Sequence, residues 1–178
     1  MCAWLLVGCS NKDDEMDRIL TLRKQLEEAQ ACEFDAVITA DYTDRIYTFS
    51  MKCRVDKSGK MDFSVTSPET IADISGSASG DGGTLTFDDR VLGFELLADG
   101  MISPVSAPWL IIRSLRSGYV EGCSASGGGM YAEIADSYMG ENLLANLWFD
   151  EKGLPQSAEL IYIGKRFLSV SITNFVIV

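Results

Sequence analysis

The sequence contains no histidine, and its 15 basic residues are outnumbered by 26 acidic ones, which gives a formal net charge of -11. Without histidine, Ser-His-Asp and Cys-His catalysis, histidine-ligated zinc and an imidazole pH switch are excluded. The acidic balance argues against a nucleic-acid-binding protein, because such a protein needs a basic face. Past the N-terminus, no apolar run approaches the ~18 residues of a membrane-spanning helix. These absences favour binding over histidine-based chemistry.

The composition that remains is that of one folded domain. The chain has 178 residues, of which 47% are apolar, and this is enough to form a hydrophobic core. Most of the negative charge falls in residues 31–100, on alternating positions such as Glu33, Asp35 and Asp41. We therefore expect one sheet face that is kept soluble by acidic side chains. No CxxC spacing occurs, so we predict no metal and no cofactor.

The N-terminus resembles the lipobox of bacterial lipoproteins, in the segment Leu6-Val7-Gly8-Cys9. In that family the signal is cut before the cysteine, whose thiol carries the lipid. No Lys or Arg precedes Lys12, so we expect a longer signal upstream. The resemblance implies a signal remnant at 1–8, a lipidated tether at 9–12 and a domain at 13–178. It places the protein on the outer face of the cell membrane, anchored through Cys9. The alternative is an ordinary buried N-terminal element.

Five cysteines are present, and the lipobox would account for two of them. Cys2 would leave with the signal and Cys9 would be lipidated. Of the three that remain, Cys32 and Cys53 could face each other across a hairpin and form a disulfide. The alternative is that Cys32, Cys53 and Cys123 are small buried side chains.

The pattern of apolar residues predicts one helix followed by strands. Positions 13–30 carry an apolar stripe at helical spacing, formed by Met16, Ile19, Leu20, Leu22, Leu26 and Ala29. Three segments of alternating polarity follow, within 32–40, 47–55 and 61–65, and predict an antiparallel meander. Ser67 and Pro68 are expected to cap and start one helical turn.

The second half predicts another helix and more strands. Residues 106–117 are apolar around most of a helical circumference, so this helix should be buried, with Gly118 ending it. Short strands are expected at 74–79, 84–87, 91–97, 119–124, 130–136, 143–149, 157–164 and 167–178. The fold class is therefore α+β, with a strongly curved antiparallel sheet of about ten strands, an open half-barrel, around a buried middle helix.

This order of elements resembles the LolA/LolB-like lipoprotein fold. The resemblance rests on residues 60–69, with their Pro-Glu turn, on 84–88, on 153–160 and on 167–175. Within that superfamily the chain is similar to germination-type lipoproteins of spore-forming Gram-positive bacteria. The resemblance implies two functions, which are binding of acyl chains inside the half-barrel and action through a protein partner, a cell-wall amidase.

A lipid pocket would need apolar side chains that face inward beneath the middle helix. The candidates are Phe34, Ile38, Phe49, Met51, Phe63, Trp109, Ile112, Leu147 and Phe149. The alternative is that they form a filled core. Arg113 and Arg116 lie one helical turn apart and could bind a carboxylate or phosphate headgroup, or simply reach the surface.

Two carboxylate pairs, Asp88-Asp89 and Asp150-Glu151, have the residue type that a glycosidase uses. Both fall in expected turns, so solvated loop charge is the favoured interpretation and a hydrolase the less favoured one. We therefore predict a non-catalytic binding module for a lipid or acyl ligand or for a cell-envelope protein. The alternative is a scaffold or activator of a cell-wall amidase, without a lipid pocket.

Overall fold

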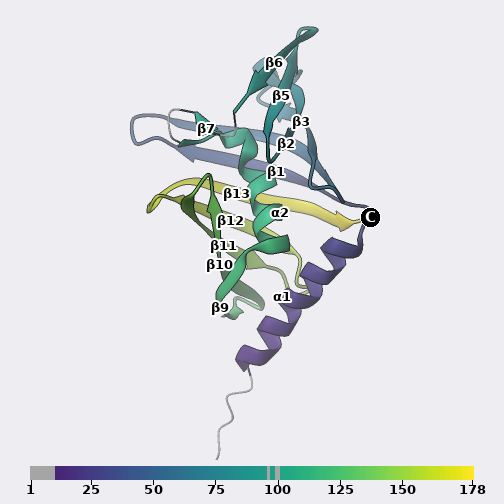
Figure 1. The fold of residues 1–178 in the computed structure, drawn as a ribbon, viewed down its shortest axis with the longest axis vertical. Coiled ribbons are helices and arrows are strands. Elements are labelled where there is room, and N and C mark those ends of the chain that lie inside the picture. The colour runs from purple at the N-terminus through teal and green to yellow at the C-terminus, as the bar shows by residue number, and fades with distance from the viewer. Residues whose placement is uncertain (1–10, 96, 99–100) are drawn as a thin grey trace, which may run out of the picture.

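The structure is a computed structural model that describes residues 11–95, 97–98 and 101–178. In this part of the chain a large antiparallel sheet of eleven strands is packed with two α-helices (Figure 1). The helices are α1 (Asn11–Glu28) and α2 (Ala107–Ser117). The strands of the large sheet are β1 (Ala31–Asp41), β2 (Ile46–Asp56), β3 (Met61–Ser67), β4 (Ser75–Ser79), β5 (Gly82–Phe87), β6 (Arg90–Phe94), β9 (Tyr119–Ser126), β10 (Gly129–Tyr138), β11 (Glu141–Phe149), β12 (Pro155–Tyr162) and β13 (Lys165–Ile177). Between β6 and α2 lie the short strands β7 (Leu97–Ala98) and β8 (Met101–Ile102) and the 3-10 turn η2 (Pro104–Ser106).

The strand order is β6-β5-β4-β3-β2-β1-β13-β12-β11-β10-β9. Each half of the sheet is a meander of sequence neighbours, because short turns join adjacent antiparallel strands. The two meanders meet where β1 pairs with the last strand, β13, so the start and end of the domain lie side by side. The predicted fold class, an antiparallel sheet with a leading and a middle helix, is confirmed. The strong curvature of a half-barrel stays a prediction.

Helix α1 begins and ends two residues before the predicted span of 13–30, and only part of the predicted apolar stripe is buried. Ile19, Leu22 and Leu26 are buried, and the helix packs against β9 and α2. Leu20 is 46% exposed, so its assignment to the buried stripe was wrong. A helix packed along one side buries only the residues that share that side, and Leu20 falls outside it. The Arg23 guanidinium joins the two helices by donating to the backbone oxygens of Leu115 and Gly118, at 2.8 and 2.7 Å.

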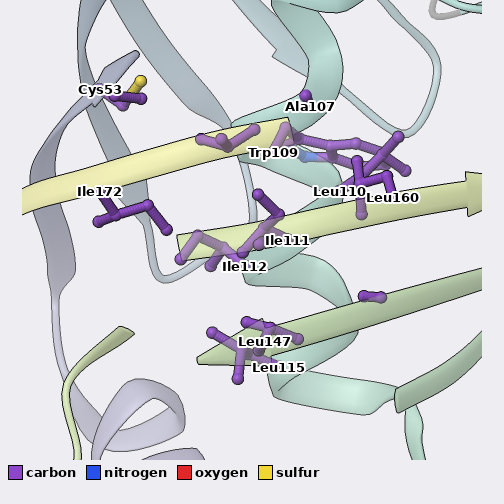
Figure 2. Close-up of a cluster of buried hydrophobic side chains, with 14 of the residues drawn as sticks. Cys53, Ala107, Trp109, Leu110, Ile111, Ile112, Leu115, Leu147, Leu160 and Ile172 are labelled. Atoms are coloured by element: carbon purple, nitrogen blue, oxygen red, sulfur yellow. The ribbon is translucent and has the colours of Figure 1, made fainter. Parts of the chain in front are cut away.

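The core lies between α2 and one face of the sheet. Every residue of α2 from Ala107 to Ile112 is buried, which agrees with the prediction of a buried helix. Figure 2 shows Leu115 of α2 drawn close to Leu147 of the sheet and Leu110 close to Leu160, and all four side chains belong to the buried core. The sheet contributes alternate residues to this core, since successive side chains of a strand point to opposite faces. The other face of the sheet carries the polar members of each alternation.

One local prediction was wrong in detail and another is confirmed. Pro68, not Ser67, is the N-cap of the 3-10 turn η1 (Glu69–Ile71), and no side chain caps it. Gly118 ends α2 as predicted, and its φ of -68° is ordinary. It is needed for space, because a Cβ at this position would lie 2.5 Å from Ile134 Cγ2.

Candidate functional site

A pocket of about 430 Å³ lies beside α2. One wall is the side of α2 that carries Arg113 and Arg116, and the other two are the turn between β2 and β3 and the turn between β4 and β5. Val55, Trp109 and Ile112 form the apolar part of the lining, and all three are buried. The polar lining is Lys57, Ser58, Gly59, Ser79, Gly80, Asp81, Arg113, Arg116 and Ser117. A pocket of this size and mixed lining is typical of a small-molecule site.

Two side chains of α2 hold the β2–β3 turn in place. The Trp109 indole Nε1 donates to the Gly59 carbonyl at 2.7 Å, and Arg116 Nη1 donates to the Asp56 carbonyl at 2.8 Å. The Asp56 carboxylate in turn accepts from the Ser58 hydroxyl at 2.6 Å and from the Lys60 backbone N–H at 3.0 Å. These hydrogen bonds, chiefly that from Ser58, lower the pKa of Asp56. The wall of the pocket is therefore a fixed turn.

The two arginines of the pocket have different partners. Arg113 Nη2 lies 3.3 Å from the Asp136 carboxylate and 2.8 Å from the Ser137 carbonyl. Its guanidinium also lies over the rings of Trp109 and Tyr138, at 5.8 and 5.4 Å from their centroids. Among the described residues, the hydrogen bond of Arg116 is the one to Asp56. Both arginines are partly buried, and 30% of the Arg113 side chain is exposed, so whether they bind a headgroup or simply reach the surface stays a prediction.

Three nitrogen atoms of these arginines are buried without a hydrogen-bond partner in the described part of the chain, namely Arg113 Nη1, Arg116 Nε and Arg116 Nη2. An unsatisfied buried donor costs about 1–3 kcal/mol, and a charged one costs more. An anion in the adjacent pocket would be attracted to both guanidinium groups and would satisfy these donors after a small rotation of the side chains. This local deficit of acceptors distinguishes the site from an ordinary surface hollow.

The structure does not bring the predicted pocket residues together in one pocket. Trp109 and Ile112 line the α2 pocket together with Arg113 and Arg116. Phe34 and Phe63 line a separate hollow of about 450 Å³, and Phe149 lines one of about 540 Å³. All nine predicted residues belong to the hydrophobic core or pack against it, including Ile38, Phe49, Met51 and Leu147. Phe34, for example, stacks on Phe175 with ring centroids 5.5 Å apart. That these residues line a ligand pocket stays a prediction.

Sequence reasoning missed the turn residues of the pocket. Lys57, Ser58, Gly59 and Asp81 are ordinary turn residues, and nothing in their local pattern distinguishes them from other polar turns. Trp109 is 50 positions from its bonding partner Gly59, so only the folded chain brings them together. The positive charge that Lys57 adds to the lining of the α2 pocket was therefore not predicted from the sequence.

The carboxylate pairs lie in turns, as expected. Asp88 and Asp89 form the exposed β5–β6 turn with positive φ angles of 50° and 58°. Asp150 accepts from the backbone N–H of Leu154 at 2.8 Å and so stabilises the β11–β12 turn. In the described residues, no three or more Cys, Asp or Glu side chains lie close enough to hold a metal ion together. Among the same residues, no helix has the length and apolar character needed to cross a membrane.

Three cysteines fall in the described part of the chain, and no disulfide joins any two of them, so the possible Cys32–Cys53 disulfide is not formed. Cys32 and Cys53 are buried on the core side of β1 and β2, which agrees with the alternative that they are small buried side chains. Burial raises the pKa of the Cys32 thiol to about 11 and also raises the pKa of Cys53. Neither thiol is therefore an activated nucleophile. The predicted lipidation site, Cys9, lies outside the described residues.

An antiparallel sheet of eleven strands, packed with an N-terminal and a middle helix, defines the LolA-like class of folds. The structure of a putative outer membrane lipoprotein-sorting protein domain from Vibrio parahaemolyticus shares this fold with a TM-score of 0.50 and 10% identity, over 93% of this chain and 92% of that chain. At this identity the likeness shows the fold alone.

Two further solved structures are similar at lower TM-scores. The LolA superfamily protein NE2245 from Nitrosomonas europaea matches with a TM-score of 0.45 and 9% identity, over 90% of this chain and 93% of that chain. A chain in the complex of the CwlD amidase from Clostridioides difficile with the GerS lipoprotein matches with a TM-score of 0.45 and 15% identity, over 97% and 99%. No protein-family model matches the sequence. No curated protein matches it either.

Proposed function

We propose that the protein is a non-catalytic binding module, anchored to the outer face of the cell membrane through a lipid on Cys9, whose α2 pocket takes an amphiphile with an anionic headgroup. In this proposal residues 1–8 are a signal remnant, residues 9–12 the tether and residues 13–178 the binding domain. The observation that carries the proposal is the set of buried, unpartnered guanidinium nitrogens of Arg113 and Arg116 beside an apolar wall.

The chemistry of the pocket fits a carboxylate or phosphate with an attached acyl chain. The pocket lining carries three positive charges, from Arg113, Arg116 and Lys57, and one negative charge, from Asp81. Trp109 and Ile112 line the pocket but are buried, so methylene groups next to the headgroup would contact them only at the base of the pocket. An uncharged ligand would leave the arginine donors unsatisfied. The fold shared with a putative lipoprotein-sorting domain supports a ligand of this class.

The headgroup is tested with two ligands that have the same chain. Oleate and oleyl alcohol differ only in the carboxylate, so titration of each into the full chain measures what the charge contributes. We expect oleate to bind at least about tenfold more tightly, and Arg116→Met to remove that difference. Lys24→Met, a substitution of an exposed residue of α1, is the control and should leave both affinities unchanged. Equal binding of the two ligands, or of oleate by the wild type and Arg116→Met, would refute the anionic pocket.

The anchor is tested separately, in cells. A Cys9→Ser variant should lose incorporation of a clickable palmitate analogue and move from the membrane fraction to the soluble fraction. Cys123→Ser, with a cysteine in a folded strand, should keep both properties. Labelling that survives in Cys9→Ser would contradict the anchor and would leave the pocket proposal standing.

A second candidate function is a scaffold or activator of a cell-wall amidase. One feature favours it, which is the apolar surface of the β5–β6 hairpin, where Phe87, Val91 and Leu92 are 46%, 67% and 60% exposed. Such exposed side chains are typical of a contact with another protein. Pulldown from native membranes, read for lipids and proteins together, distinguishes the two functions. Recovery of an amidase that is lost in Val91→Asp, with no lipid bound, would favour the scaffold.

A further inference from the structure

The face of the sheet that the helices leave uncovered carries a transverse row of side chains, formed by residues that the strand register places opposite one another. Tyr131 pairs with Trp148, Trp148 with Ser157, Ser157 with Ser171, and Ser171 with Val37. These residues alternate with buried ones such as Leu147, Ala158 and Val170, so they lie on the face opposite the core. The row crosses β10, β11, β12, β13 and β1, which at ~4.8 Å between strands is about 19 Å.

A second row lies beside the first and is wholly polar. Glu133 pairs with Asn146, Asn146 with Glu159, Glu159 with Ser169, and Ser169 with Thr39. The Tyr131 hydroxyl of the first row donates to Asn146 Oδ1 at 2.9 Å and lies 3.3 Å from Glu133 Oε2. This leaves the amide N–H groups of Asn146 as donors, because its oxygen is the partner of the tyrosine. The two rows thus set aromatic rings beside hydroxyl, amide and carboxylate groups.

The surface along the two rows is hollowed. A trough of about 380 Å³ is lined by Val37, Thr39, Trp148, Ser157, Glu159, Ser169 and Ser171, together with backbone neighbours. Trp148 and Ser157 also line a second hollow of about 540 Å³ at the β9–β10 and β11–β12 turns. Trp148 therefore stands between two hollows. Its ring is tilted by 51° to that of Tyr131, with the centroids 5.3 Å apart.

We propose that this outer trough binds an uncharged polysaccharide, with a pyranose ring stacked on Trp148. One face of a pyranose ring carries C–H groups and packs on an indole, while its hydroxyl groups need both donors and acceptors at the rim. The Asn146 amide supplies donors, the carboxylates of Glu133 and Glu159 supply acceptors, and the serine and threonine hydroxyls supply both. This site is separate from the α2 pocket and does not depend on the function proposed for it.

The charges of the trough exclude other occupants. The two rows hold two carboxylates, and Arg166 pairs with one of them, Glu159, at 2.7 Å. The remaining negative charge of Glu133 disfavours a phosphate-bearing lipid, nucleic acid or acidic polymer. The trough sets serine and threonine hydroxyls beside the apolar side chains of Val37 and Trp148, so its occupant needs both polar and apolar surface. A peptide added as a strand would need a sheet edge, and the trough lies in the middle of the sheet, across β11, β12, β13 and β1. A neutral, hydroxyl-rich chain is the ligand that satisfies all three conditions.

The test is calorimetric titration of the full chain with two probes, the hexamer of N-acetylglucosamine and the hexamer of glucose. We expect the wild type to bind at least one of them, and Trp148→Ala to weaken that binding by about tenfold or more. Ser171→Trp, at an exposed position on the floor of the trough, should block binding without removing any core contact. Tyr119→Ala is the control, because Tyr119 is 74% exposed on the edge strand β9, away from the trough.

Circular dichroism and thermal unfolding of each variant establish that it is folded. No binding of either hexamer at ~10 mM, which corresponds to a Kd weaker than any useful recognition, would overturn the proposal. Undiminished binding by folded Ser171→Trp would overturn it as well. Arg116→Met, which disables the α2 pocket, should bind the hexamer as the wild type does, so the two sites fail or succeed independently.

Discussion

Replacement of Arg116 by methionine should leave the ligand-free protein at least as stable as the wild type. The guanidinium makes one hydrogen bond, from Nη1 to the Asp56 carbonyl at 2.8 Å, and holds two buried nitrogens without a partner among the described residues. Loss of a hydrogen bond to a charged group costs about 1.5–3 kcal/mol, whereas removal of two unsatisfied buried donors returns about 1–3 kcal/mol each. The methionine keeps most of the aliphatic stem in place. These ranges place the change in the free energy of unfolding between a loss of ~1 and a gain of ~4.5 kcal/mol, so a gain is expected.

The assay is urea unfolding of both proteins, followed by circular dichroism, with comparison of the midpoints at constant slope. Arg23→Met is the matched control, because Arg23 also bonds backbone oxygens beside α2 but makes two bonds, at 2.8 and 2.7 Å. No nitrogen of Arg23 is among the buried unpartnered atoms of the described residues, so its removal should cost ~2–4 kcal/mol. If Arg116→Met instead loses ~2 kcal/mol or more, as the control does, the buried donors are satisfied in solution and the reasoning behind the anion pocket fails.

Three further predictions concern the fold. Gly118→Ala should lower the free energy of unfolding by ~1–3 kcal/mol, because the added Cβ would lie 2.7 Å from a backbone oxygen of α2. Gly122→Ala is the control: its Cβ would have nothing within 4 Å, so thermal unfolding should show a change of less than ~0.5 kcal/mol. Cys32, with a thiol pKa of about 11 against its ordinary 9.0, should resist thiol reagents until the protein unfolds. Between pH 9 and pH 11 the folded protein keeps the thiol proton of Cys32, whereas the unfolded chain loses it. The free energy of unfolding should therefore be constant below pH 9 and fall as the pH rises toward 11. Cys32→Ala should show no such fall. Leu110→Ala, at a fully buried position, should cost ~2–5 kcal/mol in urea unfolding, and Leu92→Ala, at a position 60% exposed, less than ~0.5 kcal/mol.

The elements of this fold could be predicted because their signals are local. Strand β1 alternates strictly, so the core positions of Phe34 and Ile38 follow from a period of two, and both side chains are buried. Helix α2 is apolar around its circumference, and this alone indicated burial. Leu20 was misassigned because it lies at the border of the apolar stripe. Whether such a border residue is buried depends on the neighbouring element, and β9, which packs against α1, lies about 100 residues further along the chain.

The two candidate sites could not be predicted in the same way, because each depends on contacts between distant segments. Arg116 and Asp56 are 60 positions apart, and no pattern in either segment indicates that the β2–β3 turn lies against α2. The outer trough depends on the register of β1 with β13, which sets Val37 opposite Ser171. A shift of that register by one residue would turn every side chain of the strand to the other face. Pairing of the first and last strands is therefore what creates the trough.

Ligand-induced stabilisation separates a binding arginine from a structural one at the α2 pocket. A ligand that binds only the folded state raises the free energy of unfolding by about 2.7 kcal/mol when present at 100 times its Kd. In the wild type this gain includes the hydrogen bonds that the unpartnered nitrogens of Arg116 would form with the anion. Arg116→Met removes both the cost in the free protein and the gain in the complex, so its baseline stability should be high. Its gain from the same oleate concentration should fall to about 1.4 kcal/mol, because a tenfold weaker Kd leaves the ligand at 10 times its Kd. A structural arginine predicts the opposite combination, a lowered baseline with the full response to the ligand, and the two unfolding curves of one variant therefore decide between the roles.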